Sequence, residues 1–281
     1  MPIVIALPDE KLAGFAESYG FFAIALDGLR TSTVDIVVFN LSNAPIVVDG
    51  KRRDEPCLLG LATDPVFADY SIGSGPLLTL RLFPGAFARL LGIDLSRERG
   101  IVGLDPRRHF KVAAIDARLR SVAAEPKALF AALDAALLDL LPEAAPTGLA
   151  ERFTALCLTH AGDLTVAEAL DTLGCTARTL ERATAARFGR TPKRLLRGYR
   201  VWHTRERERS SGERAELLAE FPFADLPHYL NETRRITGLN RKQLTENFAA
   251  EDALPYRYFW SDGSEAAEAD WYEERVRRWE R

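Results

Sequence analysis

The sequence predicts an α+β fold, with a β-rich sandwich- or barrel-like domain first and an all-helical domain after it. Its 281 residues exceed what one compact domain usually needs. From Ile3 to about Arg120, short β-branched runs alternate with turn residues. This pattern is typical of a β-sandwich or a small β-barrel. From Lys127 onward, apolar residues recur at every third or fourth position, which is the period of amphipathic helices.

The elements of the N-terminal part follow from these runs. Residues 34–39 predict a strand that ends at the turn Ser42–Pro45, and Ile46–Val48 leads into the hairpin dipeptide Asp49-Gly50. One helix, 84–92, interrupts the strands and ends at Gly92. Further strand candidates are 58–61, 77–82 and 111–116, of which the last could instead begin a helix.

The helical part begins with a run that Pro142 ends, and a second helix follows from Leu149. Residues 141–148, between these helices, are predicted to form a linker between two independently folding units. Limited proteolysis should therefore cut there first. The predicted divisions are a β-rich sensor-like domain at 1–124, a helix and linker at 125–149, a helical domain at 150–249, and an acidic aromatic tail at 250–281.

A helix-turn-helix can be predicted from local signals alone. Thr165 caps a helix over 166–173, with Glu168 completing a capping box. Gly174 supplies the turn, and Thr176 caps a second helix that Gly189 closes. Two short helices joined by a tight glycine turn are typical of a DNA-binding unit, although an ordinary helical hairpin has the same pattern.

The first turns of that second helix carry Arg178, Glu181 and Arg182. Arginine can bind guanine O6 and N7 with two hydrogen bonds, and glutamate can accept from cytosine N4. From Arg178 to Arg200 there are eight basic residues and one acid, in a chain of net charge −3. Such a stretch indicates a polyanion site, and its alternative is a solvated helix face.

A second pair of helices repeats the plan after a bridging helix that starts at Pro192. It comprises a short helix over 213–221, a turn at 222–224, and a helix over 226–237 that Asp225 caps and Gly238 closes. Gly238 lies 49 residues after Gly189. We expect the two recognition helices to lie on one face about 34 Å apart, one turn of B-DNA.

Several of these segments together resemble the AraC/XylS family of bacterial transcription regulators, over residues 150–248. The segments are 164–168, 176–182, 188–192, Arg200-Val201, 223–229 and 234–239. Less specifically, 35–39, 58–61 and 80–92 are similar to one branch of the family's sensor domains. The resemblance implies seven helices, two helix-turn-helix units and an N-terminal domain that senses a small molecule or mediates association.

The resemblance also implies site residues and partners. Arg178, Glu181 and Arg182 would read bases in the first unit, and Pro227, His228 and Asn231 occupy the matching face of the second. Phosphate contacts would come from Thr176, Lys193, Arg194 and Arg197. The implied partners are double-stranded DNA, RNA polymerase, a small-molecule effector and a second copy of the chain.

The chain departs from the family pattern in both units, and most of all in the second. The family usually has Phe where Thr184 and Thr233 stand, and a buried threonine needs a hydrogen-bond partner. Pro222 replaces a usual glycine, and no proline follows Gly238. A degenerate regulator that acts through protein contacts is therefore the alternative. The tail, with Trp260, Trp271, Tyr272 and Trp279 among nine acids, could serve such contacts, although a helix packed on the body is favoured.

The composition argues against metalloproteins, enzymes and membrane proteins. Three cysteines and four histidines show no disulfide framework and no metal-ligand spacing, so no metal or other cofactor is expected. A cupin-like enzyme is disfavoured because no histidine precedes His109, and no catalytic motif occurs. No run of about 18 apolar residues is present, so we expect no membrane span and a cytoplasmic protein.

Overall fold

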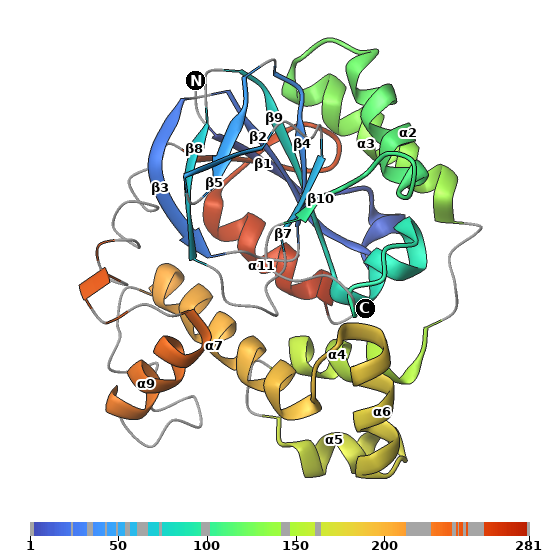
Figure 1. Cartoon of the computed structure of the whole chain (residues 1–281), viewed down its shortest axis with the longest axis vertical. Coiled ribbons are helices and arrows are strands. Elements are labelled where there is room, and N and C mark those ends of the chain that lie inside the picture. Colours follow the sequence, from blue (N-terminus) through green and yellow to red (C-terminus); the bar gives the residue numbers. More distant parts are fainter. Residues whose placement is uncertain are drawn as a thin grey trace.

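The computed structural model describes residues 3–23, 25–32, 36–42, 44–48, 50–53, 57–60, 67–72, 75–96, 102–141, 147–160, 164–211, 226–237, 240, 242–243, 246 and 256–279. Over these residues the α+β class is confirmed, with the strands gathered in one part and helices α4 to α9 in another (Figure 1). The predicted short helix at 213–221, its turn at 222–224 and the closing Gly238 lie outside the described residues.

The strands form two sheets. The larger, in spatial order, contains β10 (Val102–Gly103), β7 (Cys57–Gly60), β4 (Ile36–Asn40), β9 (Leu77–Leu82), β2 (Ala16–Phe22), β1 (Ile3–Ala6), β11 (Tyr256–Phe259) and β12 (Glu265–Ala266). The smaller contains β3 (Leu26–Ser32), β8 (Phe67–Ile72), β5 (Ile46–Val48) and β6 (Lys51–Arg53). The prediction of a strand at 77–82 and of a hairpin around Gly50 is confirmed.

The helices in chain order are η1 (Glu10–Leu12), α1 (Pro84–Ala86), η2 (Phe87–Leu91), α2 (Phe110–Arg120), α3 (Pro126–Leu140), α4 (Leu149–Thr159), α5 (Val166–Leu173), α6 (Ala177–Phe188), α7 (Pro192–Ser211), α9 (Leu226–Thr237) and α11 (Glu268–Trp279). Of the two alternatives for 111–116, the strand is wrong and the helix is confirmed, because these residues lie within α2. Val112, Ile115 and Leu119 are buried there, at helical rather than alternating spacing.

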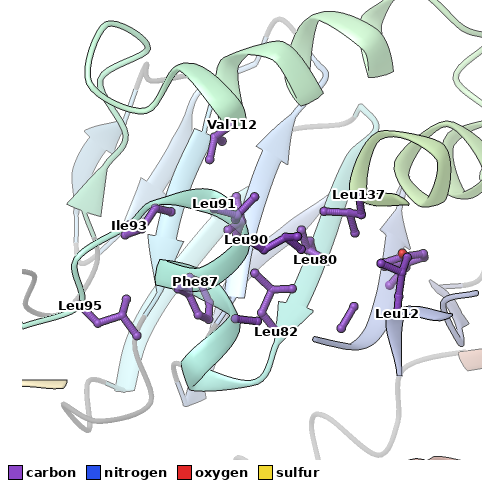
Figure 2. Close-up of a cluster of buried hydrophobic side chains, with 14 of the residues drawn as sticks. Leu12, Leu80, Leu82, Phe87, Leu90, Leu91, Ile93, Leu95, Val112 and Leu137 are labelled. Atoms are coloured by element: carbon purple, nitrogen blue, oxygen red, sulfur yellow. The ribbon is translucent and has the colours of Figure 1, made fainter. Parts of the chain in front are cut away.

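The helical segment between β9 and β10, formed by α1 and η2, covers one face of the large sheet and forms a hydrophobic core with it. Phe87, Leu90 and Leu91 of η2 are buried against the face of β9, where Leu80 and Leu82 point toward them (Figure 2). Gly92 ends η2 with φ 71°, a left-handed conformation that favours glycine, so the predicted stop is confirmed. Helices α2 and α3 add Val112 and Leu137 to the same core.

The C-terminal segment belongs to the sheet that the N-terminus starts. Strand β11 pairs in parallel with β1, with Ile3 opposite Tyr256 and Ala6 opposite Phe259. The division of 250–281 as a separate tail does not show this pairing, because parallel pairing between residues some 250 positions apart leaves no local pattern in the sequence. The chain therefore leaves the strand-rich part near Leu141, forms the helices, and returns to it.

Buried charges and aromatic rings fix helix α11 to the strand-rich part. The carboxylate of Glu17 on β2 binds both Arg275 of α11 and, at 3.0 Å, Nε of Arg81 on β9. The side chains of Glu17 and Arg275 are only 7% and 4% exposed. Arg278 donates to the carbonyl of Pro8 at 2.6 Å. These contacts make α11 a built-in part of the sheet domain.

The aromatic residues of the C-terminal segment pack within it and onto the N-terminus. Trp271 is 2% exposed and its ring centroid lies 5.2 Å from that of Tyr258, in a cluster that includes Leu7. Tyr272 stands edge-on to Trp271 with centroids 5.3 Å apart. The favoured interpretation of Trp271 and Tyr272, a helix packed on the body, is therefore confirmed.

Asp134 on α3 joins that helix to the N-terminal strands. Its Oδ1 accepts from the hydroxyl of Tyr19 at 2.7 Å and from the backbone N–H of Asp9 at 2.9 Å. Burial raises the pKa of Asp134 above its ordinary value, although the two hydrogen bonds oppose the shift. Because a raised folded-state pKa means that the fold disfavours the ionised form, stability falls as pH rises through it.

We therefore predict that Asp134→Asn becomes more favourable, relative to the original chain, as pH rises. Asparagine keeps an oxygen acceptor for Tyr19 and removes the charge, so its advantage should grow above about pH 4, where an unfolded aspartate ionises. Urea unfolding at pH 4 and pH 8 measures the difference. Asp139→Asn, on the exposed face of the same helix, is the matched control. An equal pH dependence in both variants would contradict the prediction.

Candidate nucleic-acid interface

Helices α5 and α6 form the pair that sequence analysis predicted. The N–H of Glu168 donates to Thr165 Oγ1 at 3.2 Å, and the N–H of Thr165 donates to Glu168 Oε2 at 2.8 Å, which confirms the capping box. Hydrogen bonds from Thr165 hold the pKa of Glu168 below its ordinary value. Gly174 has φ 61° and makes the tight turn that brings α6 across α5.

Helix α6 begins and ends where its caps predict. Thr176 Oγ1 accepts from the N–H of Thr179 at 3.2 Å, and Gly189, at φ 64°, donates to the carbonyl of Ala185 at 2.9 Å. The inner face of α6 buries Leu180 and Phe188, which belong to the continuous core of the chain. The helix is therefore held along one side and open along the other.

The three predicted base readers of the first unit lie on that open side. Arg178, Glu181 and Arg182 are all exposed and fall within the first two turns of α6. The backbone N–H groups of a helix's first turn lack intrahelical partners and give that end a partial positive charge. Two guanidinium groups beside such an end make a surface suited to an anionic ligand with hydrogen-bonding edges.

The hydroxyls of the two buried threonines, Thr184 and Thr233, are hydrogen-bonded within their own helices. Thr184, fully buried, donates to the carbonyl of Glu181 at 3.3 Å, and Thr233 donates to that of Tyr229 at 2.8 Å. A hydroxyl bonded to the preceding turn needs no partner from another element. Both threonines therefore fit their helices, including the α9 helix of the second unit.

Helix α7 bridges the two units and presents cations near its start. Its 20 residues correspond to a length of about 30 Å. Leu195, Leu196 and Val201 are buried, whereas Lys193 and Arg194, in the same turn as Pro192, are exposed. Figure 1 shows α7 leading away from the α5–α6 pair, with α9 packed beside it.

Arg197 lies differently from the other predicted phosphate contacts. Its Nε donates to Glu232 Oε2 of α9 at 2.5 Å, and Arg235 binds the other oxygen of Glu232 at 3.0 Å. The side chain of Arg197 is 33% exposed and that of Glu232 is 11% exposed. This pair fastens α9 to α7. The Arg197–Glu232 ion pair is not predictable from the sequence, because the two residues are 35 positions apart.

Helix α9 presents the second predicted set. Pro227, His228 and Asn231 are exposed, while Tyr229 and Thr233 are buried. The spacing of these residues matches one outer and one inner face of a helix. The predicted cap of this helix, Asp225, lies outside the described residues. The structure thus packs both α6 and α9 against α7 and leaves these predicted base-reading residues exposed.

Other kinds of site find little support in the part of the chain that the structure describes. Within it, no three His, Cys, Asp or Glu side chains gather closely enough to hold a metal ion. No helix among the described residues is both long and apolar enough to cross a membrane.

Comparisons with known proteins add a likeness in fold. No protein-family model matches the sequence, and no curated protein matches it. Among solved structures, a ToxT of Vibrio cholerae covers 82% of this chain and 98% of its own, with 7% identity and a TM-score of 0.47. ToxT of strain O395 bound to (E)-4-(8-methylnaphthalen-1-yl)but-3-enoic acid covers 88% and 99%, with 6% identity and a TM-score of 0.44. Because both TM-scores lie below 0.5, the function proposed next rests on this chain's own residues.

Proposed function

We propose that the protein is a sequence-specific DNA-binding transcription regulator of the AraC type. The observation that carries the proposal is the exposed first half of α6, which presents Arg178, Glu181 and Arg182 close to the N-terminal end of the helix. That end of a helix can enter the major groove, where arginine and glutamate can discriminate base edges. The resemblance of the segments between 164 and 239 to the AraC/XylS family supports the same function.

Phosphate contacts in this proposal come from residues flanking α6. Thr176 lies at its start, and Lys193 and Arg194 lie in the first turn of α7, all exposed. Such contacts bring affinity and orientation without sequence information. Arg197 contributes indirectly, because its pairing with Glu232 holds α9 in place.

The second unit reads bases through Pro227, His228 and Asn231 in the same proposal. The exposed faces of α6 and α9 would enter successive major grooves, which lie about 34 Å apart in B-DNA. The N-terminal domain would sense a small molecule or mediate association with a second copy. The final partner would be RNA polymerase, as the resemblance implies.

A second candidate is a regulator that acts through protein contacts with little DNA binding. One observation favours it: Arg197, a cation of the bridging helix, is taken by Glu232 and is thereby less available to a phosphate. The two candidates differ in salt dependence, because DNA binding releases counterions in proportion to the phosphates neutralised.

We predict that Lys193→Ala weakens binding of all duplexes alike and reduces the slope of log affinity against log salt by about one unit. Titrating labelled duplex with the full chain between about 50 and 200 mM salt measures both effects. Lys51→Ala, exposed on strand β6, is the control and should leave the slope unchanged. Failure of the unaltered chain to bind any duplex at low salt would favour protein contacts instead.

A further inference from the structure

A buried carboxylate lies where the strand-rich part meets the first helix-turn-helix. Glu151, in the first turn of α4, is 7% exposed. Two glycines make room for it. A Cβ built on Gly85 of α1 would lie 2.4 Å from Glu151 Cγ, and one built on Gly148 would lie 2.7 Å from Glu151 Oε2. Neither position can carry a side chain unless the carboxylate moves.

The partner of this carboxylate is on the recognition helix. Arg187, in the last turn of α6, donates from Nε to Glu151 Oε1. Arg187 is about one-third exposed, so the ion pair joins a buried carboxylate to a partly exposed guanidinium. The chain separation of 36 residues makes it a tertiary contact between α4 and α6.

A third charge connects the pair to the sheet-covering segment. Arg89 of η2 lies 4.4 Å above the ring of Phe15. Burial lowers the pKa of the Arg89 guanidinium, while Glu151 raises it and Arg187 lowers it. Arg89 is therefore within electrostatic reach of both members of the pair. Charged side chains of α4, α6 and η2 therefore lie in one neighbourhood.

The ion pair links the positions of α4 and α6. A buried carboxylate without its counter-charge is strongly disfavoured, so Glu151 and Arg187 must stay together when the parts move. Buried apolar residues on both sides, Ala86 and Phe87 before and Phe153 and Phe188 after, form one continuous core. Any shift of α1 against α4 must therefore displace Glu151, and with it the C-terminal end of α6.

We propose that Glu151 is a positioning residue through which the N-terminal domain sets the orientation of recognition helix α6. Gly85 is the contact on the sensor side, and Arg187 is the contact on the DNA-binding side. The inference rests on the proposed function, because it assigns α6 to DNA. A change that moves α1 is transmitted to Arg178 and Arg182 as a rotation or release of the helix that carries them.

The test uses glycine variants that differ only in what their new Cβ meets. Gly85→Ala forces Glu151 aside, whereas Gly14→Ala, also in the N-terminal part, meets nothing within 4 Å. Hydrogen exchange of the α6 amides in the full chain is the first measurement. We expect Gly85→Ala to speed exchange in α6 about tenfold and to weaken duplex binding about tenfold, the usual size of coupling between sites. Gly14→Ala should change neither.

A second variant separates positioning from folding. Glu151→Gln keeps the size of the side chain and removes its charge, so it should loosen the last turn of α6 while thermal unfolding of the N-terminal strands stays cooperative. Unchanged α6 exchange in both Gly85→Ala and Glu151→Gln would overturn the proposal. If α6 exchange changes while the unaltered chain binds no duplex, the positioning role stands and the proposed function fails.

Discussion

Glu17→Ala is expected to destabilise the full chain by about 3–5 kcal/mol, the usual cost of removing one member of a buried ion pair. The carboxylate lies between the guanidinium groups of Arg275 and Arg81, and its removal leaves two like charges facing each other in a buried place. The contacts of Arg275 with the rings of Trp271 and Tyr272 remain but do not replace a counter-charge. Urea unfolding of the full chain measures the loss.

The same variant should loosen α11 before the rest of the sheet. Trp271 is 2% exposed, so detachment of the helix moves its indole into water and shifts its fluorescence to longer wavelength. Glu10→Ala, an exposed carboxylate on η1, is the matched control and should cost less than about 0.5 kcal/mol. Equal losses in the two variants would show that the Glu17 cluster does not hold the C-terminal segment.

Arg178→Ala is expected to cost about 1–3 kcal/mol on the preferred DNA site and to relax the preference at one base position. Arg178 is exposed two residues after the cap Thr176, at the end of α6 that would enter the groove. On a scrambled duplex the loss should be smaller, because only phosphate contacts operate there. Paired titrations on the two duplexes measure the difference.

Lys193→Ala is the comparison for that experiment. It removes one exposed cation from the neighbouring helix α7 and should weaken both duplexes alike. Equal losses on both duplexes for Arg178→Ala would refute its assignment as a base reader. A normal fold, checked by hydrogen exchange of the α6 amides, keeps either outcome interpretable.

Local signals predicted the helical half well. Thr165 with Glu168, the turn at Gly174 and the stop at Gly189 depend on residues within four positions of each other, and each is where it was expected. The exposure of Arg178 and Arg182 also follows from periodicity, because Leu180, Thr184 and Phe188 fix the buried face. Helix caps and one-sided burial leave their pattern in a short window of sequence.

Long-range pairing was not predictable in the same way. Strand β11 pairs with β1 across most of the chain, and its sequence, Tyr256–Phe259, lies beside acidic residues that favoured a tail. Strands β2 and β8 were missed because Gly20, Glu17 and Asp69 interrupt the apolar alternation that marks a strand. The apolar run at 111–116 is compatible with either a strand or a helix. In the structure it is a helix, in which the buried residues recur every three or four positions.

The ion pairs that organise the candidate site were hidden for the same reason. Glu151 and Arg187, like Glu232 and Arg197, are each ordinary charged residues on an amphipathic helix until the fold brings them together. A signal was nevertheless present in Gly148, which stands at the cap of α4 where a hydrogen-bonding side chain is usual. In the structure, that glycine leaves space for the Glu151 carboxylate.

Selection from random DNA tests the central claim most directly. The full chain is incubated with a library of random duplexes at about 150 mM salt, bound sequences are recovered over several rounds, and the selected duplex is compared with its scrambled form. The account predicts a defined motif, with the selected duplex bound at least about a thousandfold more tightly than the scrambled one. A recovered pool without a motif, or equal affinity for both duplexes, would contradict it.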